Sequence, residues 1–387
     1  MSVGRPRHVF VSCGEASGDR YAASLASALL ALDPSVRISG LGGPRLQAAG
    51  VELVRDHADL AVMGFAEVLA RAPRLLAARR ELAARVTGSD IDVFVPIDFP
   101  GFNGHLAAAA RRRGVPVFWL VAPQVWAWGG WRTGGYRKRI DRLGVVLPFE
   151  EAWFRARGFD VFAMGHPLME DYGGDWDFED AVARRETHFG VRDGALTLAL
   201  LPGSRRQELA QLVPTLKVAA QAVGGLLAGR EIRTVVSCAP GVDEAWLAGL
   251  AGKNAEISSE PLPVLLRGVD LALVCSGTAS LEAALAGVPH EIVYRTGALN
   301  YWLARRLVRT SHIGLSNLIL GEDAVREHIQ DDAAPLPVAA GLVRWVARPD
   351  ERRAFYGAAR RLRALCGRPG VWDRTARAVL ALAGGSG

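Results

Sequence analysis

The sequence lacks the features that mark several large protein classes. It holds only four cysteines in 387 residues, and none of them has the paired spacing of a zinc or redox site. No apolar run approaches the roughly 18 residues of a membrane-spanning helix, and the first residues carry no signal-like apolar segment. These absences exclude a disulfide scaffold and a spanning protein, and they favour a reducing cytoplasm.

The motifs of common nucleotide and metal enzymes are also missing. The glycine turn from Gly14 to Asp19 lacks the full G-x-G-x-x-G fingerprint and an acidic ribose partner, so a nicotinamide cofactor is not supported. There is no Walker lysine pattern, which argues against a P-loop ATPase. No acidic D-x-D pair is positioned to hold a divalent metal at a diphosphate. We therefore expect neither a cofactor nor a metal.

The composition is that of a folded protein with anionic partners. Half of the residues are hydrophobic and 22% are charged, and the length suggests about two domains at roughly 150 residues each. The formal net charge is +6. A basic balance favours nucleic acid, nucleotides, phosphorylated sugars or an anionic membrane as partners, and charge alone does not choose among them.

Alternating strand and helix patterns predict an α/β fold in both halves of the chain. A strand at Val9 to Cys13, a glycine turn and an alanine-rich helix open a doubly wound domain, and the same rhythm returns after residue 196. A glycine-rich acidic stretch, Asp171 to Asp177, predicts the interdomain linker. The expected domains are 1–170, 171–345 and, as C-terminal helices packing back on the first domain or on a partner subunit, 346–387.

The stretch around Asp98 is the centre of the predicted site. A buried-strand pattern from Val93 to Ile97 ends abruptly in Asp98, with Pro100 just beyond it. The next strand, Val115 to Val121, should bring its downstream loop PQVWAW beside this carboxylate. Ligands of open α/β sheets bind at such strand ends. The alternative is that Asp98 only caps the following turn.

The first glycine turn offers a second acidic candidate. Glu15 and Ser17 are placed to touch a ligand at the mouth of the first domain. By residue preference, Ser17 and Asp19 could equally cap the helix that follows. Glu15 stands earlier in the turn and is harder to explain in that way.

Two strand-to-helix turns in the second half predict an anion site. LPGSRRQE and CSGTASLE put small residues at helix N-termini, where backbone N–H groups and the helix dipole attract anions. Arg205 adds a planar donor fork that matches phosphate. One such turn is usually only good turn chemistry, but two in one domain favour a diphosphate site. Further along, Asn317, Glu327 and Gln330 form an unusual polar cluster.

Two segments of the first half combine apolar or aromatic residues with arginine. Val62 to Leu76 has the pattern of an interfacial helix, although an ordinary core-facing helix is the commoner explanation. The segment after Trp126 mixes tryptophan with basic residues, which suits anionic headgroups and equally suits RNA.

A set of motifs, taken together, resembles the lipid-A-disaccharide synthases. They occur in this order and cover the chain from Val9 to about Gln330: GEASGD, GGPRLQAAG, VMGFAEVL, IDFPGFN, PQVWAW, LPFE, GHPL, LLPGSRRQE, SGTASLEAAL, SNLILGE and EHIQ. PQVWAW and LLPGSR are the most specific of them. The chain departs from the family pattern at Ala122, at Ser316 and in Gly129, Gly130 and Trp131.

The resemblance implies a GT-B fold, with two Rossmann-like domains facing across a cleft, and an inverting hexosyltransferase of lipid A biosynthesis. The implied reaction joins UDP-2,3-diacylglucosamine to 2,3-diacylglucosamine 1-phosphate, lipid X, in a β-1,6 link and releases UDP. It implies a cytoplasmic protein, peripheral on the anionic inner face of the inner membrane, with no nucleic acid partner. A homodimer is left open.

The resemblance also assigns roles to residues. Asp98 falls on the proposed general base and Glu15 on the acid of the glycine turn. The expected UDP-sugar contacts are Gly203, Ser204, Arg205, Ser276, Gly277, Thr278, Glu282, Asn317 and Gln330. The expected acceptor and membrane contacts are Met63, Phe65, Leu69, Trp126, Trp128 and Arg132.

Two other functions compete with this one. A GT-B transferase or epimerase for another UDP-sugar would keep the anion turns but would not need the apolar segment Val62 to Leu76. A basic RNA-binding or membrane-binding protein without catalysis would explain the arginines and tryptophans. It would leave Asp98 and the two anion turns unexplained.

Overall fold

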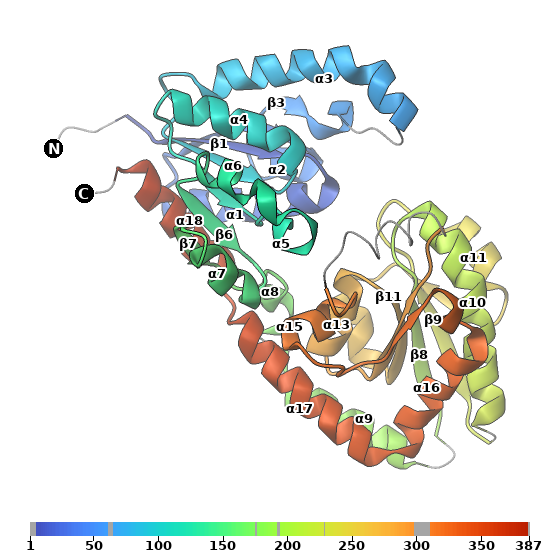
Figure 1. Cartoon of the computed structure of the whole chain (residues 1–387). Coiled ribbons are helices and arrows are strands. Elements are labelled where there is room, and N and C mark those ends of the chain that lie inside the picture. The colour runs from blue at the N-terminus through green and yellow to red at the C-terminus, as the bar shows by residue number, and fades with distance from the viewer. Residues whose placement is uncertain are drawn as a thin grey trace. The chain divides into compact units, whose positions relative to one another are not determined.

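The structure, a computed structural model, describes residues 5–60, 65–174, 176–191, 194–227, 229–297 and 310–385, without the side chains of 65–72. The chain divides into two compact units (Figure 1). Unit 1 comprises Met1–Pro167 and Arg368–Gly387, and unit 2 comprises Leu168–Gly367. Each unit contains one parallel β-sheet with helices packed on it. Both halves of the chain are therefore α/β, as the alternating patterns predict.

Unit 1 is built on a seven-stranded sheet in the order β3-β2-β1-β4-β5-β6-β7. All neighbouring strands are parallel, and the strand order reverses between β1 and β4, which is where doubly wound folds bind ligands. The strands are β1 His8–Cys13, β2 Arg37–Gly42, β3 Glu52–Asp56, β4 Val93–Ile97, β5 Phe118–Leu120, β6 Arg142–Val145 and β7 Val161–Ala163. The helices are α1 Ala16–Leu32, α2 Pro44–Ala48, η1 His57–Leu60, α3 Phe65–Val86, α4 Pro100–Arg112, α5 Val125–Trp128, η2 Gly130–Arg132, α6 Thr133–Arg137, α7 Pro148–Arg155 and α18 Val371–Ala383.

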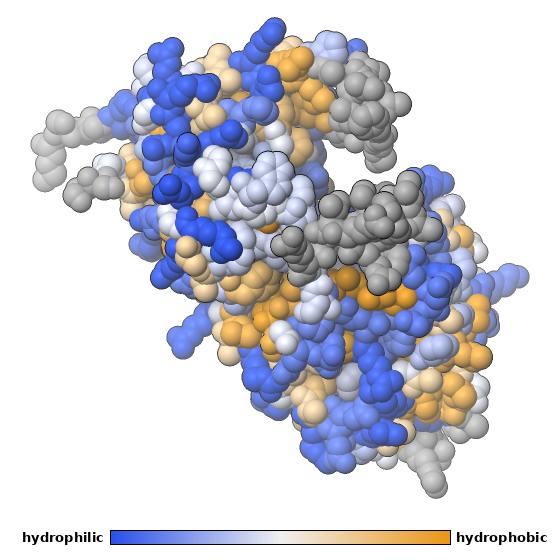
Figure 2. Space-filling model, in the orientation of Figure 1, coloured by the Kyte–Doolittle hydropathy of each residue, from blue (hydrophilic) through white to orange (hydrophobic). Residues whose placement is uncertain are grey.

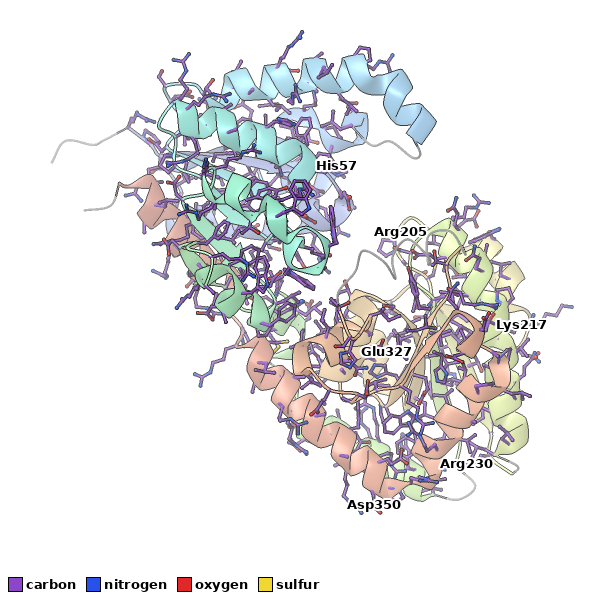
Figure 3. All side chains as sticks on the ribbon, viewed as in Figure 1. His57, Arg205, Lys217, Arg230, Glu327 and Asp350 are labelled. Carbon is purple, nitrogen blue, oxygen red and sulfur yellow. The ribbon has the colours of Figure 1, made fainter. Side chains whose placement is uncertain are left out.

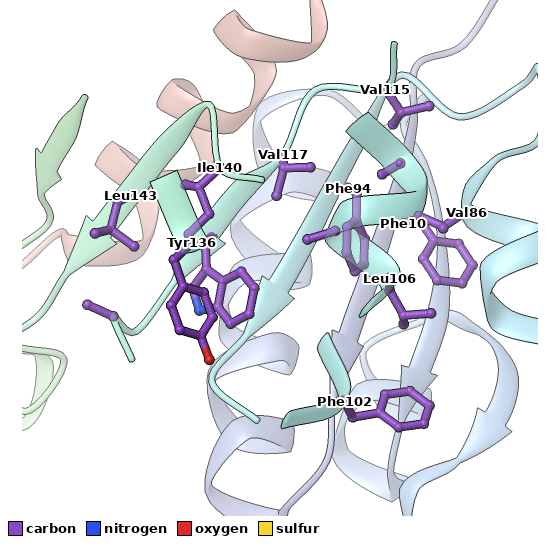
Figure 4. Close-up of a cluster of buried hydrophobic side chains, with 14 of the residues drawn as sticks. Phe10, Val86, Phe94, Phe102, Leu106, Val115, Val117, Tyr136, Ile140 and Leu143 are labelled. Atoms are coloured by element: carbon purple, nitrogen blue, oxygen red, sulfur yellow. The ribbon is translucent and has the colours of Figure 1, made fainter. Parts of the chain in front are cut away.

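Alternate residues of the central strands supply the two cores of unit 1. Phe10 and Phe94 belong to a cluster on one face of the sheet together with residues of α3 and α4 (Figure 4). Val9 and Val95 belong to a second cluster with residues of α1 and α18. Successive side chains of a strand point to opposite faces, so a continuous apolar run is expected where both faces are covered. The last helix of the chain thus completes the core that the first strand begins.

Unit 2 is built on a six-stranded parallel sheet in the order β10-β9-β8-β11-β12-β13. The strands are β8 Leu196–Leu201, β9 Ile232–Ser237, β10 Ala255–Ser258, β11 Leu271–Cys275, β12 His290–Tyr294 and β13 Glu327–Ile329. The helices are α8 Met169–Tyr172, α9 Phe178–Gly190, α10 Arg206–Leu226, α11 Glu244–Ala251, α12 Leu262–Leu265, η3 Leu266–Gly268, α13 Thr278–Leu285, α15 Leu315–Leu320, η4 Gln330–Asp332, α16 Pro335–Ala347 and α17 Pro349–Cys366.

The chain passes between the units twice. It leaves unit 1 after Pro167 and returns at Arg368, so that α16 and α17 belong to unit 2 and α18 belongs to unit 1. Tyr172 and Trp176, within the stretch expected to be the linker, are buried side chains of unit 2, and their rings contact each other.

One glycine of the central sheet cannot carry a side chain. Gly40 of β2 has a φ of 157°, and a Cβ atom there would overlap the carbonyl oxygen of Val11 on β1. Both atoms belong to the backbones of paired central strands, so neither can move away without breaking the sheet.

We therefore predict that Gly40→Ala lowers the free energy of unfolding of unit 1 by about 2 to 3 kcal/mol. The measurement is urea unfolding followed by circular dichroism. Gly134→Ala is the matched control, because a Cβ at Gly134 would meet nothing within 4 Å beyond its chain neighbours and the backbone of its own helix. Equal unfolding midpoints for the two variants would show that β1 and β2 are not so closely paired.

Candidate active site

Asp98 lies in a strained turn at the carboxyl end of β4. Its φ is 46° and that of Phe99 is 51°, so two consecutive non-glycine residues adopt the left-handed conformation. Aspartate tolerates that conformation moderately well and phenylalanine does not. Such strain is concentrated at functional sites, where the surroundings hold it in place. The side chain of Asp98 remains accessible to solvent.

Asn103 and Gly14 hold this turn. The buried Asn103 side chain donates to the carbonyl oxygens of Asp98, at 2.9 Å, and of Ser12, at 3.1 Å. Its own oxygen accepts from Ser12 Oγ at 2.6 Å, so one amide joins the end of β1 to the end of β4. The Phe99 ring lies against Gly14, where a Cβ atom would overlap it. The glycine turn and the aspartate turn therefore fix each other.

Glu15 is close enough to Asp98 to affect its pKa. Desolvation raises the pKa of the Asp98 carboxyl, a hydrogen bond from the Phe99 backbone N–H opposes the rise, and the negative charge of Glu15 adds to it. Glu15 itself is exposed at the N-cap position of α1. The structure thus brings together the two acidic residues predicted to be catalytic. A carboxylate with a raised pKa is a stronger base than a free one.

The cap expected of Asp19 belongs to a different helix. The Asp19 carboxylate accepts from the backbone N–H groups of Gly43, Arg45 and Leu46, at 2.7 to 3.2 Å, at the start of α2. The N-cap residue of α1, Glu15, makes no capping hydrogen bond with its side chain. The reading of Asp19 as a cap of its own helix was therefore wrong, because local spacing cannot reveal a partner two elements away.

Glu150 is a functional candidate that the sequence reasoning missed. It stands in the LPFE motif at the start of α7, and only 1% of its surface is exposed. Its Oε1 accepts from Trp126 Nε1 at 2.9 Å and its Oε2 from the Leu147 backbone N–H at 3.1 Å. Burial raises its pKa to about 7, against these hydrogen bonds, and the charge of Asp98 contributes to the rise. Three carboxyl groups therefore share one region of unit 1.

The PQVWAW loop is anchored at one tryptophan and exposed at another. Trp126 is held by Glu150 and by the edge of Phe149, with 4.9 Å between ring centroids. Trp128 is half exposed, and the Arg132 guanidinium lies 5.2 Å from its ring. Glu150 thus links this loop to Asp98, because it accepts a hydrogen bond from Trp126 and the charge of Asp98 raises its pKa.

An apolar cavity of about 610 Å³ is lined by Glu15 and by Phe99, the residue after Asp98. Its walls combine residues of the glycine turn with Phe99, Phe102, Leu60 and the α3 residues Leu75 and Leu76. Arg79 and His105 lie at its polar edge. The cavity can take an apolar ligand next to a carboxylate.

The expected membrane segment is only partly described. Met63 lies outside the described residues, and so do the side chains of Phe65 and Leu69. From residue 73 onward, α3 presents Leu76 with 42% of its surface exposed, and apolar residues gather over this helix in the visible face (Figure 2). No described helix is long and apolar enough to span a bilayer.

The two anion turns of unit 2 lie side by side. They follow β8 and β11, which are paired strands, and a Cβ at Gly203 would lie 3.7 Å from Cys275 Sγ at the end of β11. Gly203 and Gly277 have φ values of 96° and 141°, which glycine adopts readily. Arg205, with 81% of its side chain exposed, is paired with Glu208 at 3.2 Å (Figure 3). Ser204 and Thr278 belong to the same turns, at the starts of α10 and α13.

The other predicted UDP-sugar residues have partners within unit 2. Ser276 Oγ donates to the Ile313 carbonyl oxygen at 2.8 Å, and Glu282 accepts from the Tyr172 hydroxyl at 3.0 Å. Both therefore help to fix the walls around the β11 turn.

Asn317 and Gln330 make hydrogen bonds that fix loops. The buried Asn317 amide donates to Val325 O at 2.7 Å and to Glu327 Oε1 at 3.0 Å. Glu327 in turn accepts from the N–H groups of Ile313 and Gly314 (Figure 3). The Gln330 side chain pairs in both directions with the backbone of Thr296. Their contact with a ligand stays a prediction.

Among the described residues, no group of three or more His, Cys, Asp or Glu side chains is arranged to hold a metal ion. An anionic ligand could bind to the Arg205 guanidinium of the β8 turn and to the backbone N–H groups of the β8 and β11 turns.

The chain is similar to known proteins over nearly its whole length. Residues 9–359 match the family described as lipid-A-disaccharide synthetase. The lipid-A-disaccharide synthase of Syntrophus aciditrophicus is 36% identical over 386 residues, which cover 97% of each chain. That of Trichlorobacter lovleyi is 35% identical over 387 residues and 99% of each chain. Among solved structures, the glycotransferase of kitacinnamycin has a TM-score of 0.64 at 17% identity, with 98% of this chain and all of that one covered. The fold is therefore GT-B.

The raised pKa of Glu150 predicts a pH-dependent contribution to stability. The folded pKa, about 7, exceeds the ordinary 4.5, so the folded protein holds more protons between these pH values. Stability from this residue is full below about pH 4.5 and falls as the pH rises through 7. In the wild type this residue should lower the free energy of unfolding by about 3 kcal/mol over that pH range, and Glu150→Gln should abolish this decrease.

The measurement is urea unfolding of both proteins at pH 4.5 and pH 8. Glutamine presents an amide N–H group to one of the two donors, which changes the free energy of unfolding by an amount that does not depend on pH. The test is therefore whether the difference in free energy of unfolding between the two proteins changes with pH. Glu151→Gln, at the surface beside Arg155, is the matched control and should not reproduce that change. A difference that stays constant with pH would mean that Glu150 is ionised throughout.

Proposed function

The chain belongs to the lipid-A-disaccharide synthase family, and we propose that it joins UDP-2,3-diacylglucosamine to 2,3-diacylglucosamine 1-phosphate in a β-1,6 link. It is a glycosyltransferase that forms the lipid A disaccharide. The 6-hydroxyl oxygen of the acceptor attacks the anomeric carbon of the donor, the bond from that carbon to the diphosphate breaks, and UDP leaves. The acceptor proton passes to a base.

Asp98 is the proposed base, and its turn is the observation that carries the proposal. Its carboxylate ends a central strand, is held in a strained turn by Asn103, and has a pKa raised by desolvation and by Glu15. General-base catalysis needs a carboxylate that is fixed in position and more basic than usual. Glu15 sustains that basicity through its charge.

The leaving diphosphate is the proposed ligand of the two anion turns of unit 2. Negative charge grows on the diphosphate as the glycosidic bond breaks, and preorganised donors stabilise it without rearrangement. The starts of α10 and α13 supply backbone N–H groups, and the exposed guanidinium of Arg205 can exchange Glu208 for phosphate.

We further propose that unit 1 docks on the anionic inner face of the inner membrane. The exposed Leu76, the half-exposed Trp128 and the neighbouring arginines combine apolar contact with positive charge. Each basic residue near such a surface contributes about 1 kcal/mol of attraction. The apolar cavity beside Glu15 then receives acyl chains from the bilayer.

A GT-B transferase or epimerase acting on another UDP-sugar is the second candidate. It would use the same turns in unit 2 but would have no use for the apolar cavity of unit 1. Turnover with a donor and acceptor that carry no acyl chains would favour it.

Replacing Asp98 with asparagine should separate catalysis from folding. Asparagine tolerates the left-handed conformation and keeps the size of the side chain, so folding and UDP affinity should stay close to those of the wild type. The turnover number should fall by roughly 100-fold or more, because the base is lost. Disaccharide formation at saturating substrates, with UDP binding by calorimetry as the control, measures both. Near-normal turnover of Asp98→Asn would show that Asp98 only forms the turn and is not the base.

Replacing Arg205 with alanine should weaken UDP binding by roughly 1.5 to 3 kcal/mol, the contribution of a hydrogen bond to a charged group. Isothermal titration calorimetry with UDP measures this change. Arg206→Ala is the matched control, because Arg206 lies against the Trp246 ring, 4.8 Å from its centroid, and should change UDP affinity much less. Equal affinities of the wild type and Arg205→Ala would remove Arg205 from the diphosphate site.

A further inference from the structure

A second cavity, of about 330 Å³, lies in unit 1 on the other side of α4's first turns. Glycine and proline residues form part of its wall, and its other side chains are basic or aromatic: His105, Trp131, Arg132, Tyr136 and Arg139. None of the roles assigned above uses His105, Tyr136 or Arg139. Arg132 was expected to contact the acceptor or the membrane, with no part of the acceptor assigned to it.

Neutral partners hold the two guanidinium groups of this cavity in place. The Arg132 guanidinium lies 5.2 Å from the Trp128 ring and 5.6 Å from the Tyr136 ring, and its Nη2 donates to the Tyr136 hydroxyl at 3.1 Å. Arg139 Nη1 donates to the Gly104 carbonyl oxygen at 3.2 Å. Within the described part of the chain, neither guanidinium has a carboxylate partner within 4.0 Å. Two oriented positive charges therefore converge on one cavity with their charge uncompensated.

The pKa of His105 is affected by the positive charge around this cavity. Desolvation lowers the pKa of its imidazole, and the positive charges of Arg79 and Arg139 lower it further. The site therefore disfavours an added positive charge, and a bound anion would relieve that repulsion. Guanidinium groups, with their planar donor forks, match phosphate in particular.

The two cavities of unit 1 meet at Gly101 and His105, three and seven positions after Asp98 in the chain. One cavity is lined by leucine and phenylalanine, the other by arginine. A ligand that spans this junction needs an apolar part and an anionic part, with its reacting group near the turn between β4 and α4.

We propose that the cavity lined by Arg132, Arg139 and His105 binds the phosphate monoester of the acylated acceptor, while the apolar cavity takes its acyl chain. The assignment rests on the proposed function, which supplies an acceptor that carries both groups. Phosphate binding there sets the position of the sugar ring, and thereby presents the 6-hydroxyl to Asp98. The cavity is thus an acceptor-specificity site.

Arg139→Gln tests the assignment, with Lys138→Gln as the matched control. Lys138 is the exposed neighbour of Arg139, and its replacement removes the same charge without touching the cavity. For Arg139→Gln we expect the KM of the phosphorylated acceptor to rise roughly 10- to 100-fold, with the KM of the UDP-sugar unchanged. With 2,3-diacylglucosamine that lacks the phosphate, Arg139→Gln and wild type should have equal kcat/KM. An unchanged KM for the phosphorylated acceptor, or an equal loss on both acceptors, overturns the proposal.

A binding measurement separates this proposal from the reaction itself. Inorganic phosphate should raise the pKa of His105, followed by NMR of the ring protons in the wild type, and should leave it unchanged in Arg139→Gln. The same spectra show whether the variant is folded. A wild-type protein with no turnover on either acceptor would contradict the proposed function. A wild-type protein that turns over the acceptor, but whose His105 pKa does not change with phosphate, contradicts only the phosphate site.

Vesicles containing phosphatidylglycerol distinguish a membrane headgroup from the acceptor. If Arg139→Gln binds these vesicles as the wild type does and still loses discrimination between the two acceptors, the acceptor phosphate is the ligand. If it loses vesicle binding and keeps that discrimination, the cavity holds a lipid headgroup and the proposal is wrong.

Discussion

The left-handed turn at Asp98 and Phe99 is the constraint on which unit 1 depends. Two consecutive non-glycine residues occupy a conformation that costs of order 1 to 3 kcal/mol each, and they keep it because the Asn103 amide and the surface of Gly14 hold the turn. The turn separates the end of β4 at Ile97 from the start of α4 at Pro100. Both cavities of unit 1 border the first turns of this helix, so their shapes follow from the same turn.

The charges of unit 1 are sorted around this turn. The charge of Glu15 raises the pKa of Asp98, the charge of Asp98 raises that of Glu150, and burial brings the Glu150 pKa to about 7. Arg132, in η2, and Arg139, just after α6, carry guanidinium groups that have no carboxylate partner among the described residues. A base needs surrounding negative charge to stay basic, whereas a phosphate needs positive charge to be bound. This separation suits both roles proposed for unit 1.

The sequence predicted the elements better than it predicted the side-chain partners. The run from Val93 to Ile97 and the two anion turns of unit 2 are local patterns, and the α/β fold and the family follow from them. Glu150 was missed because its burial depends on Trp126, which stands 24 residues earlier and meets it only in the fold. Asp19 was misassigned for the same reason. The domain limits stay predictions. The ligand contacts of Asn317 and Gln330 also stay predictions. The hydrogen bonds that these two side chains make join loops that no spacing rule relates.

The placement of α18 has a consequence for biosynthesis. Val371, Ala376 and Val379 are fully buried against the face of the unit 1 sheet that α1 also covers, although the whole of unit 2 is encoded between them and the rest of unit 1. A ribosome therefore releases all of unit 2 before it releases the helix that completes the core of unit 1. Unit 2 can finish folding during translation, whereas unit 1 must keep an apolar face uncovered until α18 has been synthesised. The nascent protein is thus most exposed to aggregation, and most in need of a chaperone, in the unit that was synthesised first.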